Sequence, residues 1–114
     1  MAGANQAHGT FGENQVARWY EAQGYQVLAR NWRSRTGELD LVAGRDRLVV
    51  FCEVKARATT TYGSPFEAVT VSKQARLRRL AAEWLAQAGA GGREVRFDVA
   101  AVLSGKVEVI EAAF

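Results

Sequence analysis

Apolar residues recur along this chain with two periods, and the changes between them divide it into helices and strands. Spacings of three and four residues across 12–23 and from Leu77 to Ala88 predict two amphipathic helices. Alternating and continuous apolar runs predict strands at 25–32, 37–43, 48–55, 95–103 and 107–110. The predicted order is α-β-β-β-α-β-β, an α/β fold in which helices pack on a mixed β-sheet.

Cap and turn residues refine the second helix. Ser64, Pro65 and Glu67 suit the N-cap, N1 and N3 positions of a helix start. Ser72 suits the N-cap of a further segment, so we expect the chain to bend close to that serine. The glycines of 89–92 end the helix.

Two of the predicted strands carry acidic residues where a buried strand should have none. Because side chains alternate along a strand, Glu38 and Asp40 share one face of the first run. Glu53 and Lys55 share one face of the second. Aspartate is poorly suited to strands, so a structural explanation is weakest for Asp40. Two acids and a lysine that meet on one sheet face predict a divalent-metal site for phosphodiester hydrolysis.

The short polar segment 44–47 predicts an antiparallel hairpin between these two runs. Residues directly opposite each other in a hairpin point to the same face, which restricts the register. The apolar residues that we expect on one buried face are Leu39, Leu41, Leu48, Val50 and Cys52.

That constraint predicts a register with Asp40 opposite Phe51 and Glu38 opposite Glu53. Asp40 is then the diagonal neighbour of Glu53, roughly 7–8 Å away along the backbone. One cation at about 2.0–2.6 Å from each carboxylate oxygen spans such a gap. Glu38 lies closer to Glu53 and stays a candidate ligand.

Polar residues also begin the inward face of each predicted helix. Glu13 lies on the first stripe, and Lys73 and Gln74 lie three and four residues before Leu77. A first-turn acid favoured by the helix dipole is an equal alternative for Glu13. A solvated first turn is the usual alternative for the other two.

Two further acids have simpler structural explanations to weigh. Glu53 and Lys55 could form an ion pair near a strand end, but an exposed pair stabilises little and an inward pair is costly to desolvate. Asp98 sits between Phe97 and Val99, and Arg96 offers it a partner, so we interpret it as structural.

Composition limits the class of protein. The 114 residues suit one domain, which we place at 11–114 after a flexible tail at 1–10. The net charge of +3 permits a polyanionic partner without requiring one. A single cysteine, Cys52, predicts a reducing compartment, and no run is long enough to span a membrane. The sequence therefore predicts a soluble, cytoplasmic, globular protein.

The spacing of Asp40 and Glu53-Val54-Lys55 resembles the PD-(D/E)xK core of restriction enzymes and Holliday-junction resolvases. Leu39 stands where that motif often has proline. A longer ordered set resembles the bacterial YraN family, which has a nuclease-like core and no established role. This set covers nearly the whole chain after residue 10 and comprises Gly12-Glu13, Gly24-Tyr25, Arg30-Asn31-Trp32-Arg33, Gly37 to Leu41, Glu53-Val54-Lys55, Tyr62-Gly63, Glu67-Ala68-Val69, Lys73-Gln74 and Arg96 to Val99.

The resemblance implies a restriction-endonuclease-like core and a metal-dependent endonuclease acting on nucleic acid, with DNA as the first candidate. Asp40 and Glu53 would hold Mg²⁺ or Mn²⁺, with Glu13 as the third ligand that resolvases of this fold place there. Lys55 would act on the attacking water or on charge developing at phosphorus. Gln74 and Lys73 would contact the phosphate or a metal-bound water.

A set of arginines could track the nucleic-acid backbone without reading sequence, although for each one alone a solvated surface role is favoured. They are Arg30, Arg33, Arg35, Arg57 and Arg76. The alternatives are a non-catalytic nucleic-acid-binding module that kept the nuclease fold and a protein-interaction domain. The sequence leaves open DNA or RNA, linear or branched substrate, and whether the chain forms a homodimer.

Overall fold

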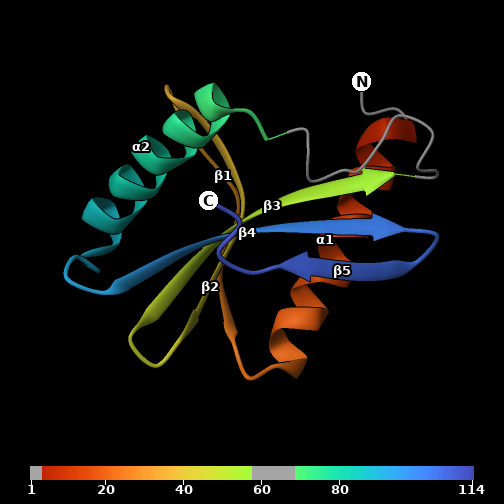
Figure 1. The fold of residues 1–114 in the computed structure, drawn as a ribbon, viewed down its shortest axis with the longest axis horizontal. Coiled ribbons are helices and arrows are strands. Elements are labelled where there is room, and N and C mark those ends of the chain that lie inside the picture. The colour runs from red at the N-terminus through yellow and green to blue at the C-terminus, as the bar shows by residue number, and fades with distance from the viewer. Residues whose placement is uncertain (1–3, 58–68) are drawn as a thin grey trace.

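The computed structural model describes residues 4–57 and 69–114, and it has the predicted order of helices and strands (Figure 1). Apolar periodicity therefore placed every element of the described chain. The elements are α1 (Ala4–Ala22), β1 (Gln26–Ser34), β2 (Gly37–Arg45), β3 (Leu48–Arg57), α2 (Val71–Ala88), β4 (Glu94–Leu103) and β5 (Lys106–Ile110).

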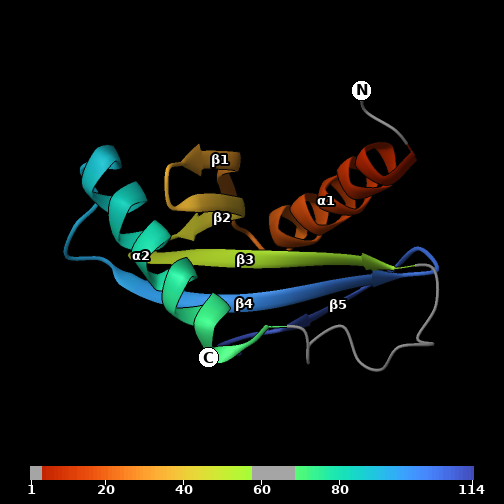
Figure 2. The same cartoon turned by 90° about the horizontal axis from the view of Figure 1, so that it is seen from above.

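The strands form one mixed sheet in the order β1-β2-β3-β4-β5. Only β3 and β4 are parallel, and α2 lies between them in the chain, as a parallel connection requires. The other neighbours are antiparallel and follow one another through short turns. Figure 2 shows β1 and β2 set apart from β3, β4 and β5 instead of continuing in line with them.

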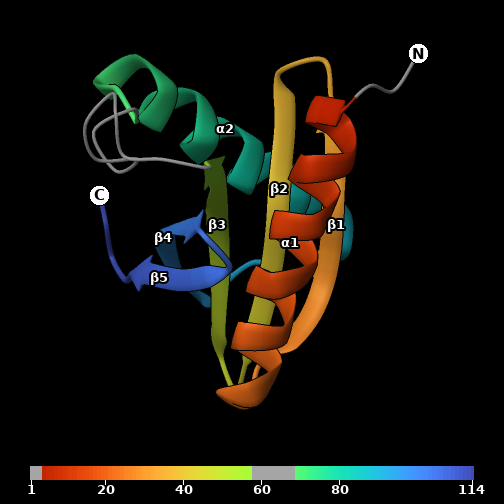
Figure 3. The same cartoon turned by 90° about the vertical axis from the view of Figure 1, so that its right-hand side faces the viewer.

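Each helix covers one face of the sheet, so both faces are buried (Figure 3). Val16, Ala17 and Tyr20 of α1 pack on one face, as the helical stripe predicted. The other face packs against α2 through Leu77, Leu80, Ala81 and Trp84.

The expectation of one shared buried face in the hairpin is wrong. Leu41, Val50 and Cys52 lie on the α1 side, whereas Leu39 packs on the α2 side. α2 covers the face that would otherwise be solvated, so both faces of the hairpin are buried. Phe51, which lies between Val50 and Cys52, therefore packs on the α2 side.

The hairpin register also differs from the prediction, by two residues. Leu41 pairs with Cys52, and the ladder continues to Arg45 opposite Leu48. The turn holds only two residues, beginning with Asp46 at φ 55°, a left-handed conformation that aspartate tolerates. The sequence suggested a four-residue turn, and the shorter one moves the strands along each other.

α1 begins earlier than predicted, and α2 begins before the segment that Ser72 was expected to cap. α1 starts at Ala4, so residues 4–10, expected as part of a flexible tail, are helical. Adding a residue to an existing helix gains a hydrogen bond at little cost, so the helix extends beyond its amphipathic part. α2 is capped by Thr70, whose hydroxyl accepts from the Lys73 amide, and not by Ser72. Gly89 ends it in the left-handed conformation, as predicted.

Two expectations fall on parts of the chain outside the description. The helix start at Ser64, Pro65 and Glu67 lies outside the described residues, as does the loop that precedes it. Within residues 4–57 and 69–114, neither helix has the length and apolar character needed to cross a membrane.

Candidate functional site

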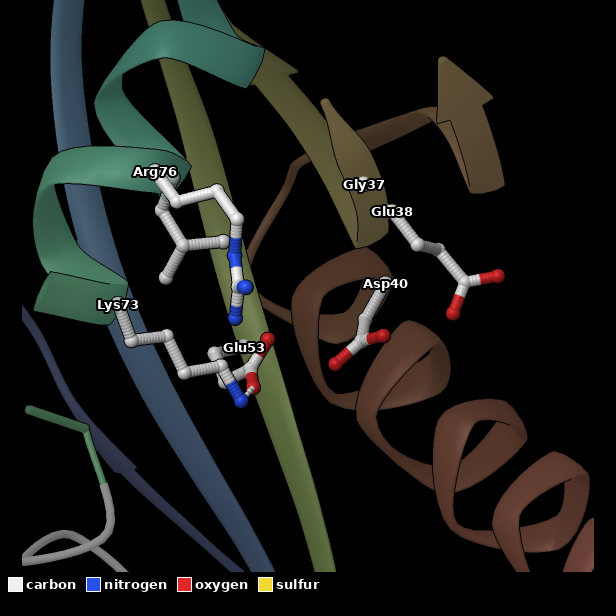
Figure 4. Close-up of a pocket in the computed structure, with 7 residues that line it drawn as sticks. Gly37, Glu38, Asp40, Glu53, Lys73 and Arg76 are labelled. Carbon is white, nitrogen blue, oxygen red and sulfur yellow. Dashed lines mark ion pairs between the residues drawn. The ribbon is translucent and has the colours of Figure 1, made fainter. Parts of the chain in front are cut away.

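A cleft of about 250 Å³ opens where β2 and β3 separate beneath the first turns of α2. Figure 4 shows Asp40, Glu53 and Lys73 pointing toward one another, with Arg76 reaching down from α2. β2, β3 and α2 supply the lining: Gly37, Glu38, Asp40, Glu53, Lys73, Arg76 and Leu77. The β2–β3 hairpin and a helix that follows it later in the chain therefore bring their polar residues together.

The cleft exists because the β2–β3 ladder stops. Its last pair is Leu41 with Cys52, and the residues of β2 before Leu41 pair only with β1. Continuing the register by one residue would place Asp40 directly opposite Glu53. Beyond this last pair, a side chain replaces the backbone acceptor: the Val54 backbone amide donates to Asp40 Oδ2 at 2.9 Å.

The two acids interact unfavourably when both are charged. Burial and, after it, the negative charge of Glu53 raise the pKa of Asp40 to about 8. A hydrogen bond with Glu53 contributes in the same direction. Glu53 is only 7% exposed, which strengthens the repulsion.

Two lysines offset the charge of Glu53. Lys73 of α2 and Lys55 of β3 both approach Glu53 Oε2, the latter at 3.4 Å. Burial alone would raise the pKa of Glu53, but the hydrogen bond and charge of Lys73, with smaller contributions from Asp40 and Lys55, together lower that pKa. Burial and the nearby Lys73 lower the pKa of Lys55. Burial would also lower the pKa of Lys73, but the hydrogen bond to Glu53 and the negative charge of Glu53 together raise it.

The donor set suits a hard divalent cation. Asp40 and Glu53 supply carboxylate oxygens, and Mg²⁺ commonly binds through one or two carboxylates and completes its shell with water and phosphate. A cation would also relieve the repulsion that raises the pKa of Asp40. In the part of the chain that the structure describes, no group of three His, Cys, Asp or Glu side chains comes together.

Glu13 lies near this pair but is held elsewhere. Its Oε1 accepts a hydrogen bond of 3.0 Å from the Asn31 amide of β1, and Asn31 has a left-handed backbone at φ 53°. Its charge still makes a small contribution to raising the pKa of Asp40, after burial and Glu53. The structure therefore places Glu13 beside the acid pair and not within a three-ligand cluster.

Gln74 does not line the cleft. Its side chain turns back and donates to the Val69 carbonyl at 3.2 Å, in the segment that leads into α2. Lys73 and Arg76 reach the cleft in its place, because they share the helix face of Leu77 and Leu80.

The five arginines that the sequence suggested for nucleic-acid contact lie in different parts of the structure. Arg30 donates to Asn14 of α1, and Arg33 pairs with Glu38 at 2.8 Å. Arg35 is exposed in the β1–β2 turn, and the side chain of Arg57 lies outside the description. Only Arg76 of this set lines the cleft.

A clasp between the β1–β2 turn and α2 was not predicted. The Thr36 hydroxyl donates to the Glu83 carboxylate, and Ser34 and Thr36 together lower the pKa of Glu83. Gly37 then faces Arg76 and Leu80. In the sequence this region shows a polar turn that ends in glycine. That pattern does not indicate that Thr36 bonds to Glu83, 47 residues further along the chain.

Comparison with known proteins places this architecture in a family. A model of the uncharacterised protein family UPF0102 matches residues 12–102. The chain belongs to this family. The match confirms the YraN resemblance and spans every residue that lines the cleft.

Similar proteins of the family come from several bacteria. The UPF0102 protein of Beutenbergia cavernae is 56% identical over 100 residues, covering 88% of this chain and 85% of the relative. That of Rhodococcus jostii is 47% identical over 115 residues, covering 96% and 98%. That of Frankia casuarinae is 54% identical over 96 residues, covering 84% and 81%. Each is named only as a UPF0102 protein, so the names carry no activity.

Proposed function

We propose that this chain is a metal-dependent endonuclease that hydrolyses phosphodiester bonds in nucleic acid, with DNA as the first substrate class to test. One observation carries the proposal: Asp40 and Glu53 enter the same cleft from adjacent strands, where their charges repel. Clustered carboxylates without a cation oppose each other, so a site that keeps them is best explained by a cation.

Asp40 and Glu53 would hold Mg²⁺ or Mn²⁺, with the Val54 carbonyl and Glu13 as further oxygen donors close by. The bound ion would supply Lewis-acid polarisation of the phosphate and a lower pKa for water at the site. Lys55, at 3.4 Å from Glu53, would neutralise charge that develops on the phosphate in the transition state. Lys73 would pass from Glu53 to a phosphate oxygen when the cation occupies that carboxylate.

The shape and charge of the cleft favour a polymer backbone over a free metabolite. At about 250 Å³ it is smaller than the roughly 300–1,000 Å³ of pockets that enclose a small ligand. A phosphodiester group can enter while the strand on either side runs across the surface. The cationic side chains on its α2 side, Lys73 and Arg76, suit that anion.

The alternative is a nucleic-acid-binding module that retains the fold without turnover. A panel of linear, nicked and four-way DNA, incubated with Mg²⁺, Mn²⁺ or a chelator, separates the two. We expect cleavage of at least one substrate that a chelator abolishes. Binding without cleavage of any substrate would favour the module.

A lysine variant tests the catalytic role within the same assay. Lys55→Ala should lower turnover by roughly 10²–10³-fold while metal and DNA affinity are retained, since the lost contact acts in the transition state. Lys106→Ala, which removes an exposed lysine at the start of β5, is the matched control. Equal turnover in Lys55→Ala and wild type would refute this role.

A further inference from the structure

Arg76 lies across the backbone of Gly37, which brings its guanidinium over the cleft (Figure 4). A β-carbon at Gly37 would lie 3.6 Å from Arg76 Cδ and 3.4 Å from Leu80 Cδ1. Gly37 also has a backbone φ of +150°, a conformation that residues other than glycine rarely adopt. A β-carbon at these distances would make ordinary van der Waals contact with both side chains, so the φ of Gly37, and not the space beside Arg76, favours glycine here.

The clasp between Thr36 and Glu83 fixes this arrangement. Glu83 lies two turns after Arg76 on α2, and Thr36 directly precedes Gly37. Tying these two residues together holds β2 against α2, and so sets how far Arg76 reaches. The arginine is thus supported on both sides: by its own helix and by the strand beneath it.

The guanidinium group of Arg76 has no anionic partner in the part of the chain that the structure describes. Three arginines of the sheet are engaged: Arg33 with Glu38, Arg30 with Asn14 and Arg96 with Asp98. Within residues 4–57 and 69–114, Arg76 forms neither an ion pair nor a side-chain hydrogen bond. Glu53, the acid that it approaches, is bound by Lys73 and Lys55.

We propose that Arg76, seated on Gly37, binds the non-bridging oxygens of the phosphate that reacts, and does not merely follow the backbone at a distance. This inference rests on the proposed function and assigns a residue to its reacting group. A guanidinium presents two parallel N–H donors that match a phosphate, and here nothing else among the described residues takes them. The phosphate would lie between Arg76 and the acid pair, at the cleft that both line.

Kinetics separate this role from distant backbone contact. Arg76→Ala should lower kcat by roughly 10²–10³-fold, because the lost donors stabilise charge that develops at the reacting phosphate. KM for DNA should change by less than about tenfold, since a single backbone contact carries little of the total affinity. Arg76→Lys should recover only part of kcat, because an ammonium lacks the paired donors.

Arg79→Ala is the matched control, because it removes the same charge from an exposed position three residues further along α2. It should leave kcat within about twofold of wild type, as a screened surface charge does. An equal fall in kcat for Arg79→Ala and Arg76→Ala would overturn the proposal, since general charge on α2 would then explain both.

A binding assay keeps the inference independent of turnover. Calorimetric titration with inorganic phosphate in Mg²⁺ buffer should show affinity at least about tenfold weaker in Arg76→Ala than in wild type, and unchanged in Arg79→Ala. Arg76→Lys, which keeps the charge but not the paired donors, should have an affinity between those of wild type and Arg76→Ala.

The outcomes distinguish the two proposals. If wild type cleaves no nucleic acid but phosphate affinity depends on Arg76, the nuclease function is wrong and the phosphate seat stands. If wild type cleaves and Arg76→Ala changes neither kcat nor phosphate affinity, the nuclease function stands and the role of Arg76 is wrong.

Discussion

Two aspartates sit among apolar residues in the sheet, Asp98 on β4 and Asp40 on β2, and their surroundings are opposite. Asp98 is 0% exposed and accepts four hydrogen bonds. Their donors are the Tyr20 hydroxyl at 2.6 Å, two Arg96 nitrogens at 2.8 and 2.9 Å, and the Ala112 amide at 3.1 Å. Asp40 accepts from one amide and faces another acid.

The difference shows how similar local sequences serve different purposes. A buried charge is stable when a counterion and several donors satisfy it, and Asp98 has both within the chain. The Asp98 network joins α1, β4 and the segment after β5. Among the residues that the structure describes, no cationic side chain forms an ion pair with Asp40, and the lysines beside it are bound to Glu53. What is missing at Asp40 is what a metal ion supplies.

The largest effect should come from Asp98. Asp98→Ala leaves Arg96 and Tyr20 without their partner, and removing one side of a buried pair costs roughly 3–5 kcal/mol of unfolding free energy. Denaturant unfolding of the variant and wild type measures the loss. A loss below about 1 kcal/mol would show that the network is not structural.

Asp40→Asn should weaken metal binding strongly without lowering the stability of the metal-free protein. Mn²⁺ affinity should fall by more than the roughly 10–100-fold that loss of an outer partner costs, because a ligand itself is lost. Metal-free stability should be unchanged or higher, since the amide oxygen still accepts from Val54 and the repulsion with Glu53 is gone.

Calorimetric titration and metal-free thermal unfolding measure the two effects of Asp40→Asn. Asp46→Asn, in the exposed β2–β3 turn, is the matched control and should bind Mn²⁺ as wild type does. Equal Mn²⁺ affinity in Asp40→Asn and wild type would exclude the metal site. A large loss of metal-free stability would make Asp40 a structural residue like Asp98.

The pH dependence of stability sharpens the same contrast. The pKa of Asp40 is about 8 in the folded chain, against an ordinary value of 3.8, so the folded state binds more protons between these values. Its contribution to stability is complete below about pH 4 and is lost as pH rises to about 8. Metal-free wild type should therefore lose stability over this range relative to Asp40→Asn, measured by denaturant unfolding at each pH. Parallel curves would contradict the raised pKa.

The smallest expected effect concerns Lys73. A cation at Glu53 competes with the Lys73 ammonium for the same carboxylate. Lys73→Met should therefore bind Mn²⁺ more tightly, by roughly fivefold or about 1 kcal/mol. Lys106→Met is the control. Weaker binding in Lys73→Met would mean that Lys73 holds Glu53 in position for the ion.

Periodicity predicted the helices, the strands and most of the cleft, because side-chain direction follows from spacing alone. Asp40, Glu53 and Lys55 came from alternation along two strands, and Lys73 from the stripe that contains Leu77. The face on which each of these side chains lies depends only on its own strand or helix, so a two-residue error in register leaves it unchanged.

Errors occurred where the outcome depended on specific contacts and not on the spacing of apolar residues. Reading the α2 stripe backwards from Leu77 could not separate Gln74 from Lys73, and the capping segment then drew Gln74 to the Val69 carbonyl. The partnership of Gly37 with Arg76 requires the turn before β2 to be fastened to α2. Neither the length of the β2–β3 turn nor that fastening is encoded by a periodic pattern.

The hydrogen bond from Val54 to Asp40 Oδ2 also has a consequence for ion selectivity. An ion held end-on through Oδ1 leaves this bond intact, whereas one chelated by both oxygens must share Oδ2 with a main-chain amide. Ca²⁺ often takes carboxylates in the chelating mode and gathers six to eight oxygens, while Mg²⁺ accepts single oxygens in a smaller octahedral shell. If the proposed cation binds, the backbone of β3 would leave Asp40 one free oxygen for it, and we expect the cleft to prefer the smaller ion.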